Sequence, residues 1–217
     1  MFTNVKFRKG ETIVEVLIAI VVFVVGALSA TRLLALSGIN TQLTKERVIA
    51  TNLSREGLEA VRNIRDTNWL RFAGERRRCW NNLDTSSCLD GDSDGVTDDA
   101  IANGENYIVR FNSTNYRWEL DASGLINRLN LTNRIDEDYR LEIDANGLYN
   151  HTTGNTDTIY FREIYTEYLD ADQSLASDES ANMLRVTSKV EWYDRGKMND
   201  VTLTTILTDY LGRKNHN

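Results

Sequence analysis

Residues 9–15, KGETIVE, lie directly before residues 16–28, VLIAIVVFVVGAL, and the second stretch contains no charged residue. The ten residues that precede Glu11 carry three basic residues and no acidic one. A basic segment ahead of an apolar run is typical of an N-terminus that stays in the cytoplasm while the following chain crosses the membrane. We therefore expect a chain that is inserted into a membrane by its N-terminal part.

The apolar run is long enough to cross a bilayer when residues 33–36 are added to it. Residues 16–36 form about 31 Å of helix if the Arg32 side chain extends toward the interface. The ten Val, Leu, Ile and Phe residues in 16–28 favour insertion by about 4 kcal/mol, whereas an acid costs about 3 kcal/mol at the membrane centre and less at its edge. Insertion is therefore favoured despite Glu15.

The composition indicates one modest globular domain in addition to the membrane segment. The chain has 217 residues, of which 41% are hydrophobic, and it has no proline that would interrupt a long N-terminal helix. Residues 1–66 hold nine Lys and Arg against six Asp and Glu, whereas residues 67–217 hold 16 against 26. This acidic exterior argues against general affinity for nucleic acid.

After Arg32 the pattern becomes that of an amphipathic helix. Apolar or small residues recur every seven positions, with a companion row beside them: Leu36, Leu43, Ala50, Gly57 and Ile64, then Ile39, Leu53 and Ala60. The small members would let a sheet approach closely, and they make poor knobs for the alternative, a two-chain coiled coil. Charges of opposite sign predict a solvated face on the other side: Arg55, Glu59, Arg62 and Asp66. We expect the helix to end between Asp66 and Asn68.

Residues 69–106 are predicted to form an irregular connection. Cys79 and Cys88 are the two cysteines of the chain, and on the exported side of a membrane they are expected to form a disulfide. Two free thiols are the alternative. Residues 76–78 are three consecutive arginines, which we interpret as a solvated or acid-paired patch rather than as a contact with DNA.

An acidic loop follows the second cysteine. Residues 90–99, DGDSDGVTDD, place oxygen ligands at positions 1, 3, 5, 7 and 9 of a loop like that of an EF-hand: Asp90, Asp92, Asp94, the carbonyl of Val96, and Asp98. Hard oxygen ligands at this spacing suit calcium. The pattern is incomplete because position 12 is Ile101, where an EF-hand has a glutamate. A metal-free acidic turn is the alternative.

From Tyr107 onward the sequence has the period of two that is typical of β-strands. The predicted strands are residues 107–111, 116–120, 139–143, 159–168, 183–193 and 201–210, with turns at 112–115 and 194–199 and a polar loop at 169–182. The alternation indicates an antiparallel sheet with one covered face, and residues 36–64 of the helix are the expected cover. The predicted fold class is therefore α+β: a long N-terminal helix, transmembrane in its inner half, with a C-terminal antiparallel β-sheet packed on its outer half.

The N-terminal features together resemble the type IV pilin superfamily, with a leader of the class III prepilin kind. The resemblance rests on a short basic leader that ends in Gly10, on Glu15 at the fifth position after that glycine, and on the continuous apolar helix. It implies that a prepilin peptidase cuts after Gly10 and methylates the new amine on Glu11. It also implies that Glu15 pairs with the N-terminus of a neighbouring subunit during assembly. Glu11 departs from the commonest first residue of the family, phenylalanine, and residues 60–69, AVRNIRDTNW, are similar to segments of PilV-type minor pilins.

The resemblance predicts a minor type IV pilin, which is a structural subunit of a pilus. One alternative is a type II secretion pseudopilin, which shares the leader and the helix, and another is a calcium-binding surface adhesin with a pilin-like anchor. A plain signal anchor would not explain the order of Gly10 and Glu15. Enzymatic activity is not predicted, because neither His151 nor His216 lies near a serine or cysteine in a recognisable nucleophile arrangement.

The expected organisation has five parts. They are a cleaved leader (1–10), a long helix (11–68), a connecting loop (69–106), a sheet domain (107–211) and a tail (212–217). Expected partners are prepilin peptidase, other pilin subunits and inner-membrane lipid, whereas nucleic acid is not expected. Calcium is the candidate cofactor. The expected location is a single-pass membrane protein with its N-terminus inside and its C-terminus outside, and then the extracellular pilus fibre.

Overall fold

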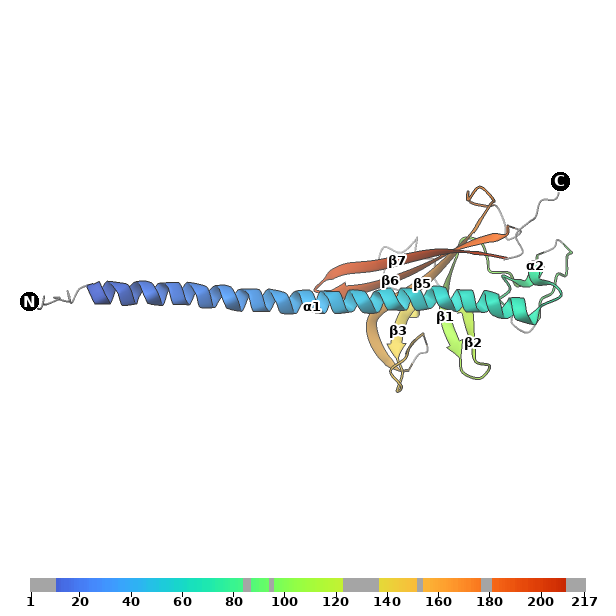
Figure 1. Ribbon diagram of the computed structural model, residues 1–217. Coiled ribbons are helices and arrows are strands. Elements are labelled where there is room, and N and C mark those ends of the chain that lie inside the picture. The colour runs from blue at the N-terminus through green and yellow to red at the C-terminus, as the bar shows by residue number, and fades with distance from the viewer. Residues whose placement is uncertain are drawn as a thin grey trace, which may run out of the picture. The chain divides into compact units, whose positions relative to one another are not determined.

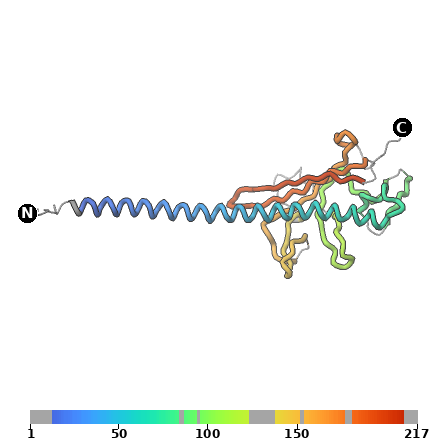
Figure 2. The backbone as a smooth tube through the Cα atoms, in the orientation of Figure 1, coloured from blue at the N-terminus to red at the C-terminus, as the bar shows by residue number. Residues whose placement is uncertain are grey.

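A computed structural model describes residues 11–83, 87–93, 96–122, 137–151, 154–176 and 181–209 (Figure 1, Figure 2). The first element, α1, is one helix, Glu11–Arg71. The chain divides into two compact units, Met1–Glu46 and Arg47–Asn217, and α1 contributes residues to both. The predicted leader, residues 1–10, lies outside the described residues.

The described part of the first unit, residues 11–46, is helical throughout. Its large apolar side chains are exposed from Ile13 to Leu36, and Phe23 is 75% exposed. Leucine, alanine and the β-branched residues tolerate the helical conformation, and no proline interrupts it. A helix that is apolar around most of its circumference is typical of a segment that lies in lipid or among other helices.

The second unit contains a seven-stranded antiparallel sheet. Its strands are β1 (Glu105–Asn112), β2 (Arg117–Asp121), β3 (Arg140–Ile143), β4 (Tyr149–Asn150), β5 (Thr156–Leu169), β6 (Met183–Asp194) and β7 (Lys197–Thr208). The order is β2-β1-β5-β3-β4, with β6 paired to β5 and β7 paired to β6. A short helix, α2 (Arg76–Cys79), and a 3-10 turn, Glu137–Tyr139, complete the described elements.

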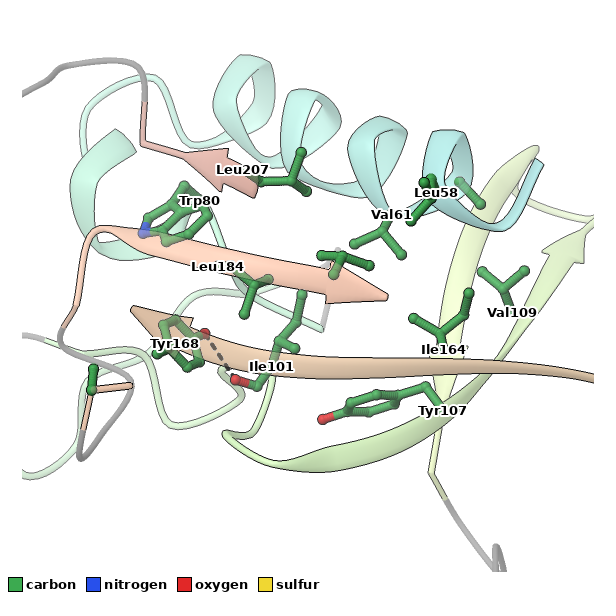
Figure 3. Close-up of a cluster of buried hydrophobic side chains, with 13 residues drawn as sticks. Leu58, Val61, Trp80, Ile101, Tyr107, Val109, Ile164, Tyr168, Leu184 and Leu207 are labelled. Carbon is green, nitrogen blue, oxygen red and sulfur yellow. Dashed lines mark hydrogen bonds between the residues drawn. The ribbon is translucent and has the colours of Figure 1, made fainter. Parts of the chain in front are cut away.

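Residues 47–71 of α1 cover one face of this sheet, which confirms the predicted α+β fold. The larger hydrophobic cluster joins α1 to four strands and to the loops: Leu58, Ala60 and Val61 with Trp80, Ile101, Tyr107, Val109, Ile164, Tyr168, Ala176, Leu184, Val186 and Leu207. Figure 3 shows Leu58 and Val61 pointing from α1 toward the sheet, and the Tyr168 hydroxyl donating a hydrogen bond to the carbonyl of Ile101. A second cluster lies nearer the start of this part of α1: Ala50 and Leu53 with Leu141, Tyr160, Val190 and Trp192.

The helix approaches the sheet most closely at Gly57. A β-carbon added at this position would lie 2.7 Å from Ser188 Oγ and 2.8 Å from Ile164 Cδ1. One turn earlier, the hydroxyl of Ser54 donates a hydrogen bond to the carbonyl of Ser188 over 2.9 Å. The predicted role of the small residues on the apolar stripe is therefore correct at this point.

Arg162 lies where the sheet divides, between the part of β5 that pairs with β1 and the part that pairs with β3. Its guanidinium is buried beneath α1 and forms an ion pair with Glu56 over 2.9 Å. It also donates hydrogen bonds to the carbonyls of Leu53 (3.3 Å) and Val109 (3.4 Å). Burial lowers the pKa of Arg162, and the Glu56 carboxylate opposes that effect. The residue thus links α1, β1 and β5 at the junction.

Several predicted boundaries differ from the structure, and three of these differences are explained by burial or by backbone contacts. The apolar stripe is buried from Ala50 to Ile64, but Leu36 and Leu43 are exposed, so the expected cover of residues 36–64 is too long at its N-terminal end. Helix α1 ends at Arg71 rather than between residues 66 and 68, because Phe72 still donates its amide to the carbonyl of Asn68 and extends the last turn.

The third difference is the start of β7, which is Lys197 rather than residue 201. Asp194 pairs with Lys197, so the connection is a two-residue turn made by Arg195 and Gly196. Their φ angles are 50° and 77°, and two positive values are typical of the tight type I′ hairpin turn. The predicted six-residue turn at 194–199 is therefore wrong. The short elements β4 and α2 are not predicted by the sequence.

Candidate functional site

The N-terminal end of α1 contains two of the predicted site residues, Glu11 for processing and Glu15 for assembly. The helix begins at Glu11, and Glu15, one turn further along, has an exposed side chain. A carboxylate near a helix N-terminus interacts favourably with the helix dipole, by about 0.3–1 kcal/mol. Gly10 lies outside the described residues, and so does the side chain of Glu11. The roles of Gly10, Glu11 and Glu15 stay predictions.

An exposed apolar surface continues along α1 from this end. Helix α1 is the single helix among the described residues that is long and apolar enough to cross a membrane, and its most apolar stretch has no buried residue. The hydroxyls within it are satisfied by the helix itself, since Ser29 donates to the carbonyl of Val25 and Thr31 to that of Ala27. Satisfied hydroxyls are compatible with hydrocarbon surroundings. The helix can therefore serve as a single membrane anchor.

The connection after α1 is closed by a disulfide between Cys79 and Cys88, as predicted. Cys79 is the last residue of α2. By loop-closure entropy a bridge across this short segment stabilises the fold by about 2–3 kcal/mol.

A buried polar network fastens this connection to α1 independently of the disulfide. Its centre is the fully buried Asn82. The bonds, each 2.6 Å long, are Asn68 Nδ2 to the carbonyl of Asn82, Asn82 Nδ2 to the carbonyl of Ser87, and Thr97 Oγ1 to Asn82 Oδ1. Buried amides that are hydrogen-bonded in this way favour the conformation that supplies their bonds.

Two of the three arginines of α2 contact neighbouring groups. Arg78 forms an ion pair with Asp90 over 3.4 Å, and the guanidinium of Arg76 lies 5.5 Å from the centre of the Trp69 ring. The interpretation as a solvated or acid-paired patch is consistent with the Arg78–Asp90 pair and with the exposure of Arg77.

The acidic loop uses two of its predicted calcium ligands for internal contacts. Asp90 is paired with Arg78, and the Asp98 carboxylate accepts a hydrogen bond from the Gly91 amide over 3.1 Å. Asp94 lies outside the described residues. Within the described ranges no group of three or more His, Cys, Asp or Glu side chains is placed to hold a metal ion. Calcium binding by Asp90, Asp92, Asp94, Val96 and Asp98 stays a prediction.

His151 is buried directly after β4. It is 7% exposed, and its Nδ1 lies 3.1 Å from the carbonyl oxygen of Arg140. The pKa of His151 lies well below 6.5, mainly because the side chain is buried. The positive charges of Arg162 and Arg110 lower this pKa further. The imidazole is therefore neutral in the folded protein at neutral pH.

The stability of the folded chain is expected to fall below pH 6.5 because of this histidine. The unfolded chain takes up a proton at His151 near pH 6.5 and the folded chain does not, so acid favours unfolding. The slope is at most about 1.4 kcal/mol per pH unit, which gives at most about 1.6 kcal/mol between pH 6.5 and pH 5 because the unfolded histidine is half protonated at pH 6.5. Urea unfolding of the wild type and of His151→Gln should diverge by this amount over that range. Parallel curves would mean that His151 is charged in the folded state.

Arg162 and Asn82 organise the second unit but are not identified by sequence reasoning. Arg162 could have been found from the sequence. Alternate positions from Tyr160 to Tyr168 face the core, and Arg162 is the one charged residue among them. No comparable signal marks Asn82, since polar residues are ordinary in a loop.

Comparisons with protein-family models, with curated proteins and with solved structures find no match to this chain. Its function is therefore inferred from the residues and contacts described above.

Proposed function

We propose that this protein is a minor type IV pilin, a structural subunit that is cut after Gly10 and assembled into a pilus through α1. The main observation in support is that two parts of α1 differ in burial. From Ile13 to Leu36 its apolar side chains are exposed, whereas from Ala50 to Ile64 its stripe is the core of the sheet domain. One helix thus offers an anchor or assembly surface and the spine of an external domain.

Burial of the exposed part of α1 is favourable both in lipid and in a bundle of similar helices, because both remove apolar surface from water. A chain held first in the inner membrane can therefore move into a fibre core without exposing this surface to water. The carboxylate of Glu15 is the exception, since it needs a partner in either apolar setting. The methylated amine of a neighbouring subunit, as the family resemblance implies, is such a partner.

The described part of α1, from Glu11 onward, is the part that the proposed cut after Gly10 would leave in the mature chain. The disulfide supports export of the second unit, because disulfides persist in oxidising compartments.

Mass spectrometry of the protein from membranes and from sheared fibres tests this function. We expect the mature chain to begin at Glu11, to carry one methyl group on its new amine, and to be present in the fibre fraction. A Gly10→Val variant, matched in every other position, should retain residues 1–10 and be absent from fibres. An intact leader, or a cut after the apolar run at small residues such as Ala30, would contradict the proposal. A chain cut at Glu11 but confined to the envelope of a secreting cell would favour the pseudopilin alternative.

A further inference from the structure

Strand β7 lies at the border of the sheet, beyond β6 (Figure 1). All twelve of its residues, Lys197–Thr208, pair with β6 in one uninterrupted antiparallel register. Among the described residues no strand pairs with its other edge. A border strand of this length presents a row of backbone amides and carbonyls that another strand can bind.

The usual features that block such an edge are confined to the start of β7. Lys197 and Asp200 are its two charged residues, and the Asn199 side chain donates a hydrogen bond to the carbonyl of Lys197 over 3.3 Å. Residues 201–207, VTLTTIL, contain no charge, no proline and no glycine, and the register shows no bulge there. Charged residues, prolines and bulges are the features by which proteins normally prevent pairing between edge strands, and residues 201–207 have none of them.

Two apolar side chains of β7 that face α1 are only partly buried. Val201 and Leu203 are half-buried, whereas their partners across the pair, Val190 and Ser188, are buried. The apolar face of the sheet thus extends beyond the area that α1 covers. One additional strand beside β7 would complete the backbone hydrogen bonds and cover this row.

We propose that this edge binds the same edge of a second copy of the chain, so that residues 201–207 of two copies form a continuous sheet. Because residues 201–207 carry no charge, two copies of this segment can pair without bringing like charges together. The outer face of β7 carries Thr202 and Thr204, and threonine pairs across strands are favourable. Thr204 already makes such a contact within the chain, 3.2 Å from the hydroxyl of Thr187. The pairing goes beyond the proposed function and does not require it.

Cysteine cross-linking of the full-length chain in its membrane or in detergent tests the proposal. Thr202, Thr204 and Ile206 are exposed on one face of β7, and the native cysteines are already bonded to each other. Each is replaced in turn by cysteine and exposed to a mild oxidant. We expect a disulfide-linked dimer, at least tenfold more abundant than the dimer from Thr114→Cys, an exposed control position in the β1–β2 turn. The residue pair that links best also reports whether the strands run parallel or antiparallel.

A charged variant separates strand pairing from association through α1. The double variant Thr202→Lys and Thr204→Lys places two positive charges on the exposed face of each edge, and it should reduce the dimer linked through Ile206→Cys at least tenfold. Circular dichroism checks that the double variant is folded. The proposal is overturned if the β7 cysteines link no better than Thr114→Cys, if the lysines leave the yield unchanged, or if the linked product in cells contains a different protein in place of the second copy.

Discussion

A Gly57→Leu variant is expected to lose about 3 kcal/mol or more of its free energy of unfolding. Even the β-carbon would lie 2.7 Å from Ser188 Oγ and 2.8 Å from Ile164 Cδ1, and Arg162 Cδ lies 3.4 Å away. The rest of a leucine side chain must therefore separate α1 from β5 and β6. Added volume in a packed interior costs about 1–3 kcal/mol when side chains can adjust, and more when backbone elements must move.

The smaller change Gly57→Ala measures how much the interface can yield. Alanine favours the helix by about 1 kcal/mol over glycine, which opposes the cost of the close contacts. Ser188 Oγ makes no hydrogen bond to the described part of the chain and can rotate, whereas Ile164 is fully buried. We expect these effects to cancel to within about 1 kcal/mol.

Gly38→Ala is the matched control, because Gly38 is also in α1 but has no neighbour within 4 Å of an added β-carbon. It should stabilise the helix slightly. Urea unfolding in detergent, followed by the fluorescence of the buried Trp80 and Trp192, gives the comparison. A Gly57→Leu midpoint equal to that of the wild type would show that α1 and the sheet are not in close contact at this position.

The close approach at Gly57 could be predicted because it depends on a pattern within one helix. Small residues recur with helical period at Ala50, Gly57 and Ala60, and such a row has few structural uses other than close packing. The same pattern includes Leu36 and Leu43, which are exposed in the structure. Periodicity identifies the face of a helix that is suited to burial, but it does not say what covers that face.

The turn between β6 and β7 could not be predicted because its sequence is atypical. Two-residue hairpin turns are usually recognised by Asn-Gly or Asp-Gly, and here Arg195 occupies the first position with a φ of 50°. A long side chain at positive φ is uncommon, so the sequence favours a longer turn. The twelve paired residues on each side stabilise the tight turn despite that preference.

The contacts of Arg162 could not be predicted because they join residues far apart in the chain. Glu56 and Arg162 are 106 positions apart, and Leu53 and Val109 belong to two further segments. Local sequence shows that an arginine interrupts an apolar row, but not which carboxylate will meet it. The Asn82 network could not be predicted for a different reason: its partners are only 5 to 15 positions away, but they come from the end of α1 and from a loop without a regular pattern.

A Glu15→Ala variant is expected to be inserted and cut normally but to enter fibres at least tenfold less than the wild type. Glu15 is exposed in the described chain, and the fold of the second unit does not use it. At the membrane edge its carboxylate reaches water, so insertion depends little on it. In a bundle of apolar helices an unpaired carboxylate costs several kcal/mol, whereas a carboxylate beside a neighbour's amine is stabilised. The pair would therefore select one axial position for each incoming subunit, and a tenfold loss corresponds to about 1.4 kcal/mol of that selectivity.

Two further variants identify the source of the effect. Glu15→Gln keeps the size of the side chain and removes its charge, so it should fail like Glu15→Ala if charge pairing guides assembly. Glu59→Ala removes an acid from the solvated face of α1, where Glu59 pairs with Arg62, and it should assemble normally. The ratio of mature protein in sheared fibres to that in membranes is the measurement for all three. Because the carboxylate destabilises an apolar bundle unless it is paired, unchanged incorporation of Glu15→Ala would mean that Glu15 never enters such a bundle, and the axial position of the subunit would then have to be set by contacts of the second unit.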